Sequence, residues 1–142
     1  MKIRVLLVDD EKDYINSLSK QLTVRNYDVT AVYKGDEALN MIQKSSFDVI
    51  LLDVSMPGKD GIETLRLIKK IDQLVQVIML TGNVTVEKAI AGMKIGAYDF
   101  LMKPTSIDEI VNKIKEVYEV KMQHEKRIHQ AEIDNIVAHR GW

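Results

Sequence analysis

Five short apolar runs, separated by longer segments of helical periodicity, constrain the fold of this chain more than any other feature. The runs cover residues 3–8, 29–33, 47–52, 75–80 and 98–102. The intervening segments repeat apolar residues every three or four positions, which is typical of helices with one buried face. Strands that alternate with helices indicate an α/β fold built on a parallel sheet. Three of the runs are nearly continuous in apolar residues, as expected of strands buried on both faces.

The chain has 142 residues, which is enough for one domain with a substantial core. Right-handed crossovers leave few topologies for five parallel strands, and the commonest is the doubly wound, flavodoxin-like order 2-1-3-4-5. We therefore predict a doubly wound five-stranded parallel sheet with an extended C-terminal helix. Ligands of such sheets bind outside the carboxyl ends of the strands, where strands 1 and 3 are neighbours.

Polar side chains follow four of the five predicted strands. Asp9 and Asp10 follow strand 1, Asp53 follows strand 3, Thr81 ends strand 4, and Lys103 follows strand 5. Because the carboxyl ends of parallel strands meet at one edge of the sheet, these side chains are expected to lie together. Close carboxylates repel one another unless a cation joins them, and oxygen ligands without His or Cys suit Mg²⁺.

This combination can carry phosphoryl transfer. A carboxylate beside Mg²⁺ and a lysine can attack phosphorus and form an acyl phosphate, with the cations neutralising charge on the phosphoryl oxygens. Each residue also has an ordinary structural interpretation: Asp10 can cap a helix, Thr81 can sit in a turn, and Lys103 can be a solvated loop lysine. Asp53 is harder to explain in this way, because an unpaired acid at the end of a buried strand costs desolvation energy.

Four stretches in this order give the chain a family resemblance: "LLVDDE", "ILLDVSMPGKDG", "MLTG" and "GAYDFLMKP". Together they resemble the receiver (CheY-like) domain of bacterial two-component response regulators, over about residues 1–120. The resemblance implies that Asp53 accepts a phosphoryl group from a sensor histidine kinase. It also implies that Mg²⁺ is held by Asp9, Asp10, Asp53 and the backbone carbonyl of Ser55.

The resemblance further implies a phosphoryl-binding and switching apparatus. Thr81 and Lys103 are expected to contact the phosphoryl group, and Thr81 and Phe100 to form a coupled switch pair. Pro57 and Gly61 are expected to fix the loop after the acceptor, and the bond before Pro104 to be cis. The output is expected at the face formed by helix 4, strand 5 and helix 5, where a homodimer or another partner would bind.

Two enzyme or carrier functions compete with this interpretation. A phosphatase of the haloacid dehalogenase type also uses an aspartyl nucleophile, but on its first strand and with a general acid two residues later, where this chain has Ser55. A flavin-binding electron carrier would need a phosphate-binding loop after strand 1, which is not seen. We therefore expect no enzyme activity beyond the chain's own phosphoryl transfer and autodephosphorylation.

Residues 121–142 extend beyond the expected end of the domain. Without an interior Pro or Gly, helix 5 is predicted to run unbroken over 106–140, roughly 50 Å. Ile128, Ile133, Ile136 and Val137 would be exposed on a lone helix, so we interpret the extension as a linker or dimerisation helix. The three histidines lie here without the i, i+4 spacing of a metal site.

Charge and composition exclude several classes of partner. The net charge of −1 and the mixed charges of the tail give no support for nucleic-acid or membrane binding by this chain. No apolar run approaches the ~20 residues that span a bilayer, and the first apolar run is too short for a signal peptide. With no cysteine present, a cytoplasmic location is expected.

Overall fold

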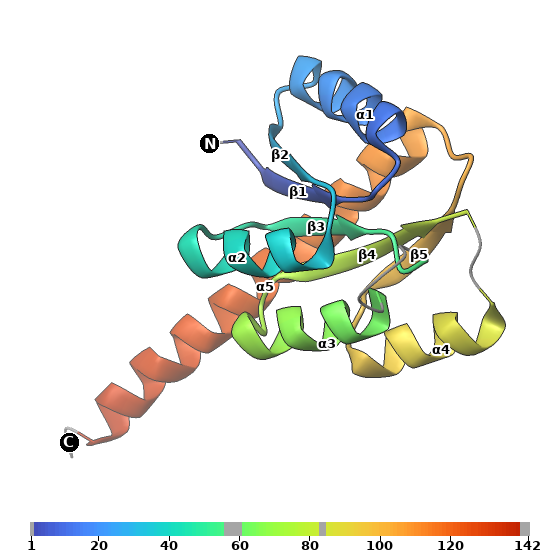
Figure 1. The fold of residues 1–142 in the computed structure, drawn as a ribbon. Coiled ribbons are helices and arrows are strands. Elements are labelled where there is room, and N and C mark those ends of the chain that lie inside the picture. Colours follow the sequence, from blue (N-terminus) through green and yellow to red (C-terminus); the bar gives the residue numbers. More distant parts are fainter. Residues whose placement is uncertain (1, 56–60, 83–84, 140–142) are drawn as a thin grey trace.

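The computed structural model describes residues 2–55, 61–82 and 85–139 (Figure 1). Within them strands and helices alternate in the predicted order. Their bounds are β1 Arg4–Val8, α1 Lys12–Val24, β2 Asp28–Val32, α2 Gly35–Lys44, β3 Val49–Leu52, α3 Gly61–Ile71, β4 Gln76–Thr81, α4 Val86–Ile95, β5 Asp99–Met102 and α5 Ile107–His139. All neighbouring strands are parallel, in the order β2-β1-β3-β4-β5. The predicted doubly wound fold is confirmed.

The sheet separates two apolar cores, and β1 contributes to both. Val5 and Leu7 pack into the core under α1 and α5, whereas Leu6 and Val8 pack into the core under α2 and α3. Successive side chains of a strand point to opposite faces, so a strand covered on both sides must be apolar at every position. All four side chains are fully buried, and each contributes roughly 1.5–3 kcal/mol.

Helix α4 lies close to the sheet because it carries a glycine at the contact. A methyl group on Gly92 would lie 2.3 Å from Sδ and 2.7 Å from Cε of the buried Met79 on β4. Packing therefore explains this glycine: any larger residue would press against the Met79 side chain.

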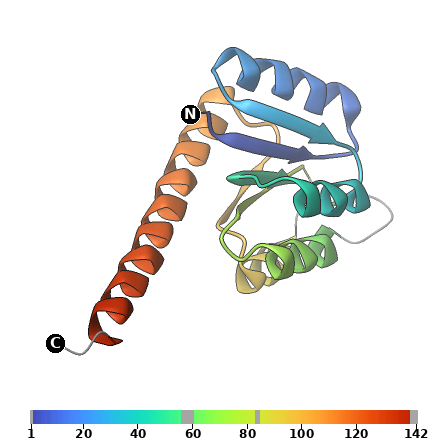
Figure 2. The same ribbon diagram turned by 90° about the vertical axis from the view of Figure 1, so that its left-hand side faces the viewer.

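Helix α5 packs on the sheet over its first half and then leaves it. Ile110, Ile114 and Val117 form its buried face. The next residue on this face is Lys121, which is 8% exposed and places Nζ 2.9 Å from Oδ1 of Asp48, just before β3. Beyond it the helix extends clear of the sheet (Figure 2), on the edge where the strands begin. Although α5 has 33 residues, neither it nor any other helix of the described residues is apolar enough to cross a membrane.

Candidate functional site

Backbone hydrogen bonds fix the two acids that follow β1 and β3. The Asp9 amide donates to the Val32 carbonyl at 3.2 Å, and the Asp53 amide donates to the Val8 carbonyl at 2.9 Å. The sheet ladder thus continues one residue past the end of each strand. The side chains of Asp9 and Asp53 emerge on adjacent central strands at the same edge, as the sequence predicts.

Three carboxylates meet at this edge. Asp9, Asp10 and Asp53 each offer an oxygen, and these oxygens all lie within 4.8 Å of one another. Asp9 and Asp53 are buried, at 2% and 3% exposure, while Asp10 is exposed. Hard carboxylate oxygens with one side open to solvent suit Mg²⁺, which keeps several waters when bound to protein. The donor set fits that ion; the backbone carbonyl of Ser55 stays a predicted fourth ligand.

Lys103 reaches into the acid cluster from the end of β5. Its amide donates to the Thr81 carbonyl at 3.0 Å, and its Nζ lies 2.5 Å from Oδ2 of Asp9 and 3.5 Å from Oδ2 of Asp53. Glu11 is a further neighbour at 3.6 Å. Burial alone would lower the pKa of Lys103, but the hydrogen bond to Asp9 and the surrounding carboxylates raise it above its usual range. Lys103 is therefore a permanent cation at the site.

The pKa values of the two buried carboxyls shift in opposite directions. Burial raises the pKa of Asp9 above its ordinary value, against the opposing effect of Lys103. Burial acts on Asp53 as well, but hydrogen bonds from Ser55 and the charge of Lys103 hold its pKa below the ordinary value. Asp53 is the carboxyl whose ionised form the site favours, as a nucleophile requires.

Ser55 joins Asp53 to Thr81 through its hydroxyl. The Ser55 amide and Oγ both donate to Oδ1 of Asp53, at 2.9 and 2.7 Å, and Oγ lies 3.0 Å from Oγ1 of the buried Thr81. From the sequence only the backbone carbonyl of Ser55 is expected at the site, and the contact made by its side chain is not predicted. A serine two residues after an aspartate is the available signal, since such pairs bond locally in turns.

The first residue of α3 lies against the backbone of Val54, the residue that follows Asp53. A methyl group on Gly61, at the start of α3, would lie 2.3 Å from Cα and 2.6 Å from the carbonyl oxygen of Val54. Only glycine allows this approach of two backbone segments. Pro57, the other residue expected to fix the loop after Asp53, lies outside the described residues. The bond between Lys103 and Pro104 is cis.

Phe100 lies apart from the acids, on the side of β5 that faces α4. Phe100 is 38% exposed and lines an apolar cavity of about 280 Å³, together with Val86, Ile90 and Met102. Thr81, the other member of the predicted switch pair, is fully buried at the end of β4.

Tyr14 is a neighbour of the site that the sequence does not predict. It lies in the first turn of α1, and the centre of its ring is 4.5 Å from Nζ of Lys103. In the sequence it is one apolar position of a helical repeat, and nothing in that pattern indicates a contact with a residue 89 positions away.

The sequence matches known regulators. The family model of the response regulator receiver domain matches residues 5–115. The chain is 34% identical over 114 residues to the transcriptional regulatory protein YkoG of Bacillus subtilis, and 34% identical over 115 residues to the response regulator MprA of Mycobacterium bovis. These alignments cover 80% and 81% of this chain but 50% of each relative. The chain thus spans about half the length of the curated relatives it matches.

Solved structures agree with the fold and with the family match. A CheY-like receiver domain protein of Methanospirillum hungatei superposes with a TM-score of 0.85 at 27% identity, covering 87% of this chain and 99% of that one. The receiver domain of the Francisella response regulator 1452 gives a TM-score of 0.76 at 34% identity, covering 83% and 98%.

Proposed function

Because this chain belongs to the response regulator receiver domain family, whose members work with histidine kinases, we propose that Asp53 accepts a phosphoryl group from a sensor histidine kinase. The observation that carries the proposal is the setting of Asp53: a buried carboxylate, held ionised, that faces a lysine and two further acids. Receivers of this family are not conventional enzymes, and the reaction proposed is the chain's own modification.

The transfer needs a nucleophile in line with a leaving group. An oxygen of Asp53 attacks the phosphorus of a kinase phosphohistidine, the P–N bond breaks, and the imidazole leaves with its electron pair. Lys103, beside Asp53, balances the charge on the phosphoryl oxygens as the new acyl phosphate forms. Later attack of water on phosphorus releases inorganic phosphate and restores the carboxylate, which is the autodephosphorylation expected of the chain.

Asp9, Asp10 and Asp53, with the carbonyl of Ser55, are the residues that would hold Mg²⁺. When bound, the ion neutralises charge on the carboxylates and on the phosphoryl oxygens. The residues of the chain do the rest: Asp9 orients Lys103 through their direct ion pair, and Ser55 fixes one oxygen of Asp53 by two hydrogen bonds.

The output of the site is proposed at the face formed by α4, β5 and α5. A phosphoryl group on Asp53 would draw the Thr81 hydroxyl away from Ser55 and change the space available to the Phe100 ring. That face already exposes large apolar side chains, namely Val86, Ile90, Met93, Phe100 and Met102. Such a patch favours a protein partner, which we propose to be a second copy or a downstream effector.

We further propose a division into a receiver domain, 1–120, and a helical extension, 121–142, that acts as a linker or dimerisation helix. Ile128, Ile133, Ile136 and Val137 are 40–59% exposed along it, which favours a protein partner. Two of the relatives are transcriptional or response regulators of about twice the aligned length, so an effector domain would lie outside this chain. Nucleic-acid binding is not proposed for the chain itself. Its location is proposed to be the cytoplasm, where ATP-dependent kinases act.

The decisive experiment is incubation with acetyl phosphate and Mg²⁺, followed by intact-mass measurement. The wild-type chain is expected to gain one phosphoryl group, Asp53→Asn none, and Asp28→Asn, an exposed acid at the start of β2, as much as wild type. Absence of the modification in the wild-type chain would overturn the proposal. Sustained release of phosphate from many small esters would instead favour the haloacid-dehalogenase-type phosphatase, which the family match does not favour.

The extension is tested separately by its effect on size. Beryllofluoride with Mg²⁺ mimics the phosphorylated state, and we expect it to shift the full chain towards dimer in sedimentation. A chain ending after Met122 keeps the Lys121–Asp48 pair and should lose that shift if the extension dimerises. An unchanged shift would place the dimer contact on the α4–β5–α5 face.

A further inference from the structure

The aromatic ring of Tyr14 is in contact with the cation of the site. Nζ of Lys103 lies 4.5 Å from the ring centre, inside the ~6 Å at which an ammonium is attracted by the face of an aromatic ring. The Lys103 side chain is 10% exposed, so little water competes for this contact. Tyr14 reaches the site from α1, an element that contributes none of the acids.

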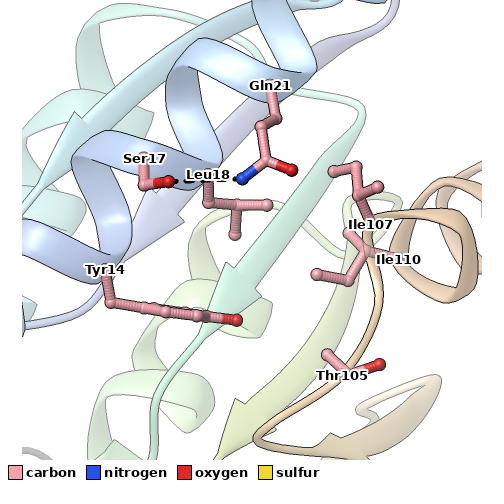
Figure 3. A pocket seen from close by; sticks show the side chains of 7 residues that line it. All are labelled: Tyr14, Ser17, Leu18, Gln21, Thr105, Ile107 and Ile110. Atoms are coloured by element: carbon pink, nitrogen blue, oxygen red, sulfur yellow. Dashed lines mark hydrogen bonds between the residues drawn. The ribbon is translucent and has the colours of Figure 1, made fainter.

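The hydroxyl of Tyr14 does not explain its position. That hydroxyl is buried and finds no hydrogen-bond partner among the described residues. The hydroxyl end of the Tyr14 side chain points towards Thr105 and Ile110, in a cavity of about 70 Å³ between α1 and the start of α5 (Figure 3). Burial raises the pKa of Tyr14 above its usual range, so the ring stays uncharged. The useful part of this side chain is its ring.

The two buried carboxylates that pair with Lys103 have a second task, and its third carboxylate neighbour, Glu11 at 3.6 Å, is largely exposed to solvent. Asp9 and Asp53 attract its Nζ now, but the same two carboxylates belong to the acid cluster that fits a divalent cation. A carboxylate engaged by such a cation, or converted to an acyl phosphate, has less negative charge to offer a lysine. The attraction of an uncharged ring depends on neither event.

We propose that Tyr14 is a positioning residue for Lys103. The face of the Tyr14 ring keeps the Lys103 ammonium beside Asp53 while this lysine exchanges its carboxylate partners for the phosphoryl group. The inference rests on the proposed function, since it assigns Tyr14 a part in that transfer. It also makes a claim about the unphosphorylated chain, namely that the ring and the ammonium are in contact there.

The chain contains a matched control for this contact. Lys12 lies over the ring of Tyr33 at 5.3 Å, but Lys12 is exposed and makes no ion pair with the acid cluster in the described residues. Tyr33→Leu therefore removes a similar ring from a similar lysine without touching Lys103. It should leave phosphorylation unchanged.

The contact itself is measured by NMR on the Lys103 side chain in the metal-free protein. The ring current of residue 14 should shift the Hε resonances of Lys103 upfield in the wild type and in Tyr14→Phe. Tyr14→Leu should lose this shift, while Tyr33→Leu keeps it. A wild-type spectrum without the shift, or a shift that survives Tyr14→Leu, would overturn the inference.

The role is measured by the rate of phosphorylation by acetyl phosphate. Tyr14→Leu should slow the reaction about 3- to 30-fold, the rate change that corresponds to the free energy of a partly desolvated cation–ring contact. Tyr14→Phe, which keeps the ring, should react at the wild-type rate. In a Lys103→Met background, Tyr14→Leu should add no further loss. Tyr14→Met replaces the leucine variant if thermal unfolding shows that the latter is not folded.

Three kinetic results would overturn the inference. The first is a wild-type rate in Tyr14→Leu, and the second is an equal loss of rate in Tyr14→Phe and Tyr14→Leu. The third is an additive loss of rate in the Lys103→Met background, because additivity would mean that Tyr14 has a merely structural role. A wild-type chain that is not phosphorylated at all would overturn the proposed function instead. The Lys103 shift would then still decide whether the contact exists.

Discussion

Replacing Gly61 by alanine is expected to damage the candidate site without touching any of its side chains. The added Cβ would lie 2.3 Å from Cα, 2.6 Å from the oxygen and 2.7 Å from the carbonyl carbon of Val54. Unbonded carbons rest ~3.5–4.0 Å apart, so the two backbone segments must separate by more than about 1 Å. Val54 is 1% exposed and its backbone has no rotamer to change. We therefore expect a loss near the upper end of the ~1–3 kcal/mol typical of overpacking.

The displacement would be passed directly to the acceptor, because Val54 is bonded to Asp53. A shift of ~1 Å in a reacting group can cost ~10²-fold in rate, so phosphorylation by acetyl phosphate should fall by that order in the molecules that remain folded. Gly92→Ala is the matched control: its Cβ would also meet an atom at 2.3 Å, but that atom is the sulfur of Met79, a side chain that can adapt.

Urea unfolding gives the stability change of each variant, and intact-mass kinetics give the phosphorylation rate. Gly61→Ala should lose both stability and rate, whereas Gly92→Ala should lose some stability and keep its rate. If Gly61→Ala phosphorylates at the wild-type rate, the close approach of Gly61 to Val54 does not position the acceptor.

Three further results are expected. Lys121→Met should cost about 1–3 kcal/mol of the free energy of unfolding in urea, because the half-buried Asp48 loses its ion pair and keeps the hydrogen bond from the Arg4 amide; a loss below the error of the measurement would contradict this. Ser55→Ala should raise the pKa of the acceptor carboxyl, followed by carboxyl-carbon NMR, since it removes the hydroxyl hydrogen bond that lowers this pKa and leaves the one from the backbone amide; an unchanged titration would count against the hydroxyl's role. The Lys113 hydrogen bond holds the pKa of Asp99 below its ordinary value despite partial burial, so this pair stabilises the fold above about pH 4 and that contribution is lost as the pH falls further. On the acid side, the urea concentration at the unfolding midpoint should therefore fall less steeply with decreasing pH in Asp99→Asn than in the wild type. Equal slopes in the two proteins would refute the assignment.

The sequence predicts this fold and much of the site because both depend on local pattern and on strand order. Continuous apolar runs identify the central strands, and parallel pairing then brings every strand end to one edge, with Asp9, Asp53 and Lys103 among them. The same reasoning cannot predict contacts that depend on the direction and length of a single side chain. In the sequence Tyr14 is an apolar position of a helix, and only the structure shows its ring against Lys103, the residue that follows β5.

The C-terminal extension begins with another contact that the sequence does not predict. Lys121 falls on the buried stripe of α5, and the sequence treats it as an interruption of an apolar seam. The structure places it in an ion pair with Asp48, 73 residues away along the chain. A charged residue on an apolar stripe indicates a polar partner close to the core, but only the fold identifies that partner.

The central claim is that Asp53, among all the acids of the chain, carries the phosphoryl group. Borohydride reduces an aspartyl phosphate to homoserine, which peptide mass spectrometry locates to a single residue. After treatment with acetyl phosphate and Mg²⁺, we predict homoserine at position 53. Homoserine at Asp9, Asp10 or another acid, or none at any position, would contradict the account.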